Sequence, residues 1–96
     1  MILTSKQRKY LRSLAHFLDP YIIIGKHGLS SSAIKSINKS LTDHELIKVR
    51  IQIGDKRKLG LIIEEKASAS IVGIIGKILI LYRFSPDKED SIIKLP

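Results

Sequence analysis

The spacing of apolar residues changes several times along the chain, and each change predicts where a helix or strand begins or ends. Thr4 and Gln7 have the spacing of a capping box, the pair of side chains that starts many helices. Apolar residues then recur at helical intervals between positions 11 and 18, until Asp19-Pro20 ends the predicted helix. The next four residues, 21–24, are apolar throughout and predict a short strand.

The middle of the chain contains a second helix and the clearest strand. Residues 34–41 again place apolar side chains at helical spacing, serines just before them can cap the helix, and Thr42-Asp43 closes it. Residues 46–53 alternate between apolar and polar side chains, which predicts a strand with one buried face. The side chains expected on that face are Ile47, Val49, Ile51 and Ile53.

The following segment predicts a third helix and a hairpin. Asp55 can cap this helix, and Gly60 is a weak point within it. The residues that give the helix its period are Leu59, Ile62, Ile63 and Lys66. Residues 71–75 and 78–82 are two apolar runs, and Gly76-Lys77 between them suits a type II′ turn.

The order of these elements predicts an α/β fold in a single domain over residues 1–96. A helix followed by βαβαββ is expected to form a two-layer sandwich with a mixed four-stranded sheet, and right-handed crossovers place both crossover helices on one face. The last two strands are apolar at nearly every position, which is typical of strands buried on both faces. Either the first helix or a partner must therefore cover the second face. Residues 85–96 form a charged tail, in which Ile92-Ile93 can add a short edge strand.

Charge makes nucleic acid the favoured partner. The 96 residues carry 17 Lys and Arg against 9 Asp and Glu, a net charge of +8. Most of the excess lies in residues 1–50, and an anionic membrane surface or solubility alone are the alternatives. The chain has no cysteine, which fits a reducing compartment, and we expect a cytoplasmic protein. We see neither a signal-peptide pattern nor an apolar run of about 20 residues that could span a membrane.

The tetrad Gly25-Lys26-His27-Gly28 is the strongest candidate site. It lies between a predicted strand and a predicted helix start, where glycines let the backbone approach a polyanion and a helix points free N–H groups at it. An ordinary tight turn between strand and helix is the alternative interpretation. The candidate nucleic-acid contacts are Gly25, Lys26, His27, Gly28, Ser30, Lys35 and Lys39 near the tetrad, and Lys6, Arg8, Lys9 and Arg12 on the first helix. Solvated helix faces are the alternative for the cations, and helix capping comes first for Ser30.

Nothing in the sequence favours catalysis. Walker A and Rossmann patterns are absent, the three histidines are scattered without cysteine, and we expect no metal, cofactor or catalytic residue. Glu64 and Glu65 are adjacent on a helix, so they point about 100° apart and do not form a carboxylate dyad.

Other polar and aromatic residues leave less definite expectations. The tyrosines are too few and too scattered for a base-stacking platform, so recognition of RNA backbone and shape is favoured. We expect His16 and His44 to bond nearby backbone. Arg83 is either a charge at a strand end or an RNA contact, and its charge alone does not decide between them.

Several motifs together resemble a known family. They are Leu3–Arg8 with Leu14–His16, Ile24–Leu29, His44–Val49, and Ile75–Lys77 with Leu79–Arg83. In this order they are similar to the single-domain bacterial YhbY-like proteins, which consist of one CRM domain (chloroplast RNA splicing and ribosome maturation). Two segments depart from the family pattern: Ser68–Ser70 replaces a threonine-glycine stop, and Lys56–Lys58 replaces an acidic or mixed segment.

The resemblance implies a fold like the C-terminal domain of translation initiation factor 3. It also implies RNA binding through the Gly-x-x-Gly loop, by analogy with KH domains, and association with precursors of the large ribosomal subunit. Our leading hypothesis is a monomeric RNA-binding protein that assists ribosome assembly by binding rRNA. The alternative is a module that docks onto a ribosomal protein or assembly factor through the apolar face of the last two strands.

Overall fold

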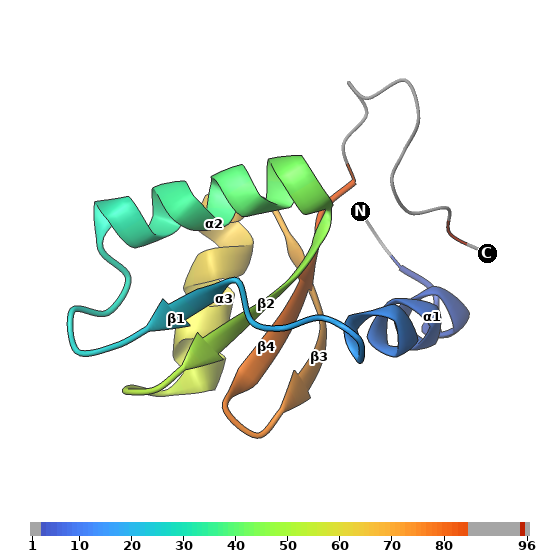
Figure 1. Cartoon of the computed structure of the whole chain (residues 1–96), viewed down its shortest axis with the longest axis horizontal. Helices are drawn as coiled ribbons and strands as arrows, with labels where there is room; N and C mark the ends of the chain where they lie inside the picture. The colour runs from blue at the N-terminus through green and yellow to red at the C-terminus, as the bar shows by residue number, and fades with distance from the viewer. Residues whose placement is uncertain (1–2, 85–94, 96) are drawn as a thin grey trace.

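The computed structural model describes residues 3–84 and residue 95. Figure 1 shows a mixed sheet with helices on both sides of it. The elements are α1 (Ser5–Ala15), β1 (Ile22–Ile24), α2 (Ser31–His44), β2 (Leu46–Ile51), α3 (Lys56–Ala67), β3 (Ser70–Ile75) and β4 (Ile78–Tyr82). The predicted order, a helix followed by βαβαββ, is confirmed. The charged tail and the short strand proposed at Ile92-Ile93 lie outside the described residues.

The four strands form one sheet in the order β1-β2-β4-β3. β1 pairs in parallel with β2, and β4 is antiparallel to both β2 and β3. The mixed sheet is therefore as predicted, and β1, β2 and β3 all point the same way. Their carboxyl ends lie along one edge of the sheet, so the loop after β1, the loop after β2 and the β3–β4 turn share that edge (Figure 1).

The two crossover helices cover one face of the sheet, and α1 covers part of the other. On the first face, Ile37 of α2 and Ile63 of α3 belong to one cluster of buried side chains with Val49 of β2. On the second face, Leu11 of α1 is buried in a separate cluster with Ile80 of β4. α1 therefore supplies part of the second cover, over Val72, Ile80 and Tyr82, whereas Ile75 at the end of β3 is 61% exposed.

Two arginines fasten α1 to β3. The guanidinium of Arg8 donates to the Ile71 carbonyl at 2.8 Å, and that of Arg12 donates to the Val72 carbonyl at 3.0 Å. Gly73 leaves room for this contact, since a Cβ there would lie 2.8 Å from Cδ of Arg12. Arg8 and Arg12 therefore hold the fold together, whatever else they contact.

All three predicted caps are present. Thr4 and Gln7 form the capping box of α1, with N···O distances of 3.0 and 3.1 Å. The Ser30 hydroxyl accepts from the Ala33 N–H at 3.1 Å, and the Asp55 carboxylate accepts from the first turn of α3. These signals act within a single turn of helix, which is why the sequence reveals them.

Three predicted boundaries or faces are wrong. Helix α1 ends at Ala15, because the chain tightens there into bonds such as Leu18 N–H to the Ala15 carbonyl at 3.0 Å. Strand β2 ends at Ile51, and Ile53 is 57% exposed beside a turn in which Gly54 has φ 107°.

The buried face of α3 also differs from the prediction. Gly60 is buried on it, because a Cβ there would lie 2.8 Å from Cδ1 of Ile71. Ile62 is 41% exposed, and Lys66 is exposed as well. The hairpin turn agrees with expectation, since Gly76 has φ 57° and Ile75 pairs with Ile78.

Candidate nucleic-acid interface

The tetrad forms a tight turn at the end of β1. The Gly28 N–H donates to the Gly25 carbonyl at 3.0 Å, which leaves Lys26 and His27 as the two exposed central residues. Gly28 has φ 62°, and a Cβ there would meet nothing within 4 Å. Backbone conformation, not lack of space, therefore calls for glycine at position 28. Gly25 has no positive φ, so the turn itself needs only the second glycine.

The turn leads directly into the positive end of α2. Ser30 precedes the helix and caps it, as expected, so one hydroxyl lone pair is already used by the Ala33 N–H. The first turn of α2 contains no acidic side chain. The remaining N–H groups of that turn and the helix dipole make the loop electropositive, which suits a phosphate.

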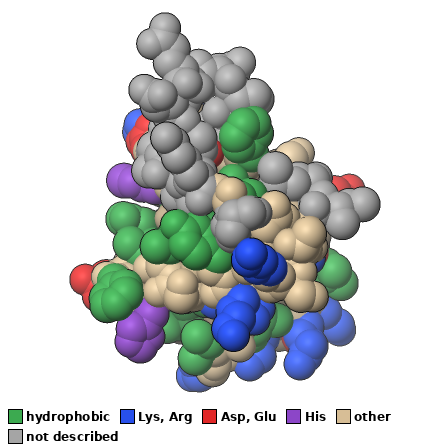
Figure 2. Space-filling model, turned by 90° about the vertical axis from the view of Figure 1, so that its right-hand side faces the viewer, with side chains coloured by type: hydrophobic (Ala, Val, Ile, Leu, Met, Phe, Trp, Pro, Cys, Tyr) green, Lys and Arg blue, Asp and Glu red, His purple; other side chains and the backbone are tan. Residues whose placement is uncertain are grey.

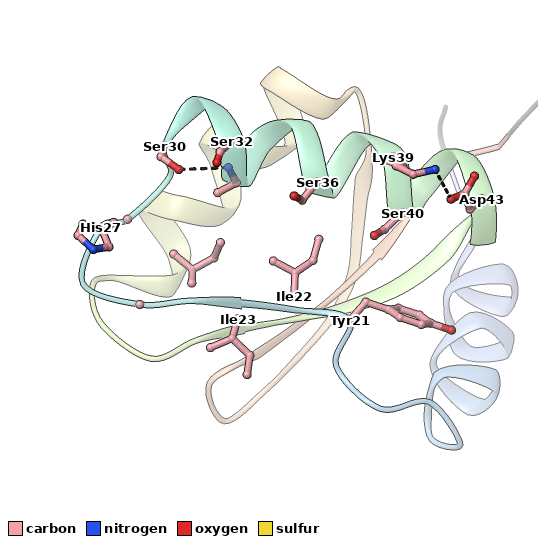
Figure 3. Close-up of a pocket in the computed structure, with 14 residues that line it drawn as sticks. Tyr21, Ile22, Ile23, His27, Ser30, Ser32, Ser36, Lys39, Ser40 and Asp43 are labelled. Atoms are coloured by element: carbon pink, nitrogen blue, oxygen red, sulfur yellow. Dashed lines mark hydrogen bonds and ion pairs between the residues drawn. The ribbon is translucent and has the colours of Figure 1, made fainter.

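A groove of about 580 Å³ extends from this loop between β1 and α2 (Figure 3). Ser32, Ser36 and Ser40 lie one turn apart along its helical wall. In Figure 3, Ile22 points from β1 toward α2, whereas Ile23 points to the opposite side of the strand. Small hydroxyl side chains keep the groove open, and β1 is the edge strand of the sheet that the described residues form.

The two lysines of α2 lie beside this groove. Lys35 is exposed and lines a shallower hollow together with Lys39. The Lys39 ammonium lies 3.1 Å from the Asp43 carboxylate, with 78% and 48% of the two side chains exposed. Such an exposed pair contributes at most about 1 kcal/mol, so a phosphate can compete for Lys39.

The cations of α1 do not join this site. Figure 1 shows α1 at the opposite end of the long axis from the tetrad. Figure 2, which faces that end, shows blue side chains gathered over its lower part. Lys6 and Lys9 of α1 are exposed, whereas Arg8 and Arg12 also donate hydrogen bonds to β3. The candidate cations of α1 and those near the tetrad therefore lie on two separate surfaces.

Arg83 has a structural role that the sequence could not assign. Its guanidinium donates to Asn38 Oδ1 and to the Ala67 carbonyl, both at 2.7 Å, and to the Asn38 carbonyl and Thr42 Oγ1, both at 2.8 Å. These acceptors belong to α2 and to the last residue of α3. Arg83 thus joins the two helices that cover the first face of the sheet.

The aromatic side chains include a pair that sequence analysis missed. The rings of Tyr21 and His44 stack with centroids 4.5 Å apart and planes at 6°. Tyr21 lines the groove at the end away from His27 (Figure 3). His16 meets Phe17 edge-on, with the ring centroids 5.4 Å apart. No local spacing could reveal the contact between Tyr21 and His44, which lie far apart in the chain.

The described residues hold no group of three or more His, Cys, Asp or Glu placed to bind a metal ion. Within the same part of the chain, none of the helices combines the length and apolar character needed to cross a membrane.

Comparison with known proteins gives a consistent result. The CRS1/YhbY (CRM) domain model matches residues 3–83. A Haemophilus influenzae protein named RNA-binding protein is 39% identical over 97 residues, which cover 98% of this chain and 95% of that protein. The Bacillus subtilis protein named probable RNA-binding protein YqeI is 37% identical, with 99% of this chain and 100% of that protein covered.

A solved structure agrees with the fold. The solution structure of SAV1595 from Staphylococcus aureus superposes with a TM-score of 0.82 at 42% identity, and the match covers 99% of this chain and 100% of that one. The sequence motifs, the fold and the relatives therefore lead to one conclusion: this chain belongs to the CRS1/YhbY (CRM) domain family.

Proposed function

We propose that this protein binds RNA through the Gly25–Gly28 turn and the groove between β1 and α2. The observation that carries the proposal is the position of Lys26 and His27, exposed on a turn that opens onto both the groove and the start of a helix. The turn offers cationic and N–H groups to phosphates, and the groove offers hydroxyls and apolar surface to a strand that leaves the turn. The names of the relatives from Haemophilus influenzae and Bacillus subtilis support RNA as the ligand.

The biological target that we propose is rRNA in precursors of the large ribosomal subunit, where the protein assists assembly by binding. The similarity of the sequence to YhbY-like proteins supports this target. The activity that we propose is binding, which agrees with the names of the relatives as RNA-binding proteins.

A titration of RNA at several salt concentrations tests the proposal. Replacing Lys26 by Glu should remove one phosphate contact and lower the log–log salt slope for a single strand by about 0.7. Lys66→Glu, an equal charge change at the far end of α3, is the matched control and should leave the slope unchanged. If Lys26→Glu binds RNA as tightly as the parent at every salt concentration, the loop is not the binding site.

A second measurement tests the ribosomal target. Lys26→Glu should fail to sediment with large-subunit precursors from cells in which the parent protein does so. If the variant stays on those particles, the loop does not mediate binding to large-subunit precursors. A protein-docking face on the last two strands remains the alternative: Leu79 and Ile80 of β4 are buried, whereas Ile74 and Ile75 of β3 are 36% and 61% exposed.

A further inference from the structure

A second group of cations lies beside the tetrad, although the sequence separates it into two parts. We call Lys56, Arg57, Lys58 and Lys77 the basic rim. The first three begin α3 after the β2 loop, and Lys77 lies in the β3–β4 turn. Because β1, β2 and β3 are parallel, both segments lie on the same edge of the sheet as the tetrad (Figure 1).

Hydrogen bonds hold the segments of this edge in fixed positions. The Lys56 ammonium donates to the Gly76 carbonyl at 2.5 Å, and the Ile51 N–H donates to the Lys77 carbonyl at 2.7 Å. On the other side of β2, the Gln52 N–H donates to the Ile24 carbonyl at 2.9 Å. The rim and the tetrad therefore form one preorganised edge.

The charge of the rim has no counterpart among its neighbours. Arg57, Lys58 and Lys77 are exposed, and none of them forms an ion pair with another described residue. Asp55 is the only acid in the segments that form this edge, and its carboxylate accepts from the N–H groups of Arg57 and Lys58 at 2.9 and 3.4 Å. The positive charge that the rim presents to solvent is therefore neutralised only slightly, by Asp55.

Stability does not explain Arg57 and Lys58. They lie in the first turn of α3, where the positive end of the helix dipole favours acidic side chains, and no acid is present in that turn. A local rule broken without a stabilising gain is expected at functional sites.

The rim lies outside the groove. The residues that line the groove come from β1, the tetrad and α2, and none comes from α3 or the β3–β4 turn. A single strand that follows the groove from His27 toward Tyr21 consequently runs away from the rim (Figure 3). Strands in a sheet lie about 4.8 Å apart, so the β3–β4 turn, two to three spacings from β1, puts Lys77 roughly 10–15 Å from the tetrad.

We propose that the basic rim binds the phosphate backbone of a second RNA strand. The ligand is then a structured RNA in which one strand occupies the loop and groove and a neighbouring paired strand crosses the rim. This inference depends on the proposed RNA-binding function and adds the class of RNA that the site selects.

The test compares a single-stranded RNA with a hairpin that contains the same sequence next to a paired stem. Arg57→Gln/Lys58→Gln should lower the salt slope for the hairpin by about 1.4–1.8, which corresponds to two phosphate contacts, and should leave the slope for the single strand unchanged. Lys66→Glu has the same net charge as this double variant and alters the other end of α3, so it controls for long-range electrostatics. Circular dichroism at the assay temperature confirms that each variant is folded.

Each outcome decides the matter. If Arg57→Gln/Lys58→Gln weakens binding of the hairpin and not of the single strand, the result supports contact between the rim and a second strand. The proposal is overturned if the double variant weakens binding of both RNAs equally, if Lys66→Glu weakens binding as much, or if binding of the hairpin is unchanged. Lys26→Glu in the same assay separates the two proposals: if it weakens both RNAs while the rim variant weakens neither, the loop function stands and the rim inference fails.

Discussion

Replacing Arg83 should lower stability sharply and leave the RNA site intact. The Arg83 guanidinium makes four hydrogen bonds to acceptors on α2 and α3, at 2.7–2.8 Å. One acceptor is the carbonyl of Ala67 at the end of α3, a group that has no partner within its own helix. The positive charge also lies where the negative end of that helix dipole favours it.

The magnitude follows from these contacts. Hydrogen bonds to a charged donor contribute about 1.5–3 kcal/mol in net terms, and water can replace part of what is lost at this half-buried position. We therefore expect Arg83→Gln to lower the free energy of unfolding by about 2–3 kcal/mol. For a domain of this size, that loss corresponds to a fall in Tm of roughly 8–24 °C. Arg83→Lys should recover only part of it, because an ammonium cannot reproduce the planar fork.

Thermal unfolding followed by circular dichroism measures this effect. Lys66→Gln is the control, since it removes an exposed charge near the same end of α3 and should change stability by less than about 0.5 kcal/mol. RNA affinity of Arg83→Gln, measured well below its Tm, should equal that of the parent protein. A fall in Tm of less than about 2 °C would refute the claim that Arg83 stabilises the fold by joining α2 and α3. Weaker RNA binding by the folded variant would show that Arg83 also contacts the RNA.

Three further predictions concern Gly28, Gly73 and Tyr82. Gly28→Val should weaken RNA binding because φ 62° costs a branched residue about 1–2 kcal/mol, whereas Gly28→Asn should bind nearly as the parent does; equal affinities in titrations would contradict this. Gly73→Ala should lower stability by about 1–3 kcal/mol in urea unfolding, because its Cβ would lie 2.8 Å from Cδ of Arg12, and the loss should not add to that of Arg12→Ala. Burial, and then the charge of Glu45, raise the pKa of Tyr82 above its ordinary value of 10.0, so the folded state holds that proton more tightly than the unfolded chain. The stability linked to Tyr82 is complete below about pH 10 and is lost as pH rises through the raised pKa; Tyr82→Phe should flatten this part of the pH profile, and an identical alkaline decline in both proteins would count against it.

The sequence predicted features that depend on neighbours within a turn or two. Thr4, Ser30 and Asp55 were each recognised as caps because a cap and its helix are adjacent in sequence. The face of α3 was wrong because apolar spacing cannot show that Gly60 packs beneath Ile71 on another element. Helix propensity makes glycine a weak point of a helix, whereas here its missing side chain allows α3 to approach the sheet closely.

Longer-range features were beyond the sequence for a related reason. Arg83 could not be assigned because its partners on α2 lie 41 and 45 residues away. The sequence does not reveal the basic rim, because Lys58 and Lys77 come to the same edge of the sheet only through the strand order, in which β4 lies between β2 and β3. The cations of α1 were grouped with the tetrad for the opposite reason: closeness in sequence suggested a common surface, and the fold places them at opposite ends.

The same topology explains why charge gathers at one edge of the sheet. A helix that connects two parallel strands runs back antiparallel to them, so both α2 and α3 begin at the edge where β1 and β2 end. The positive ends of two helix dipoles are therefore directed at that edge, in addition to the charge of its basic side chains. Neither first turn contains an acid, although Asp55 caps α3, and Lys26 and the basic rim add to the potential. Anion binding at the carboxyl edge follows from the chain's connectivity, whereas the basic side chains determine how far along the edge an RNA can make contact.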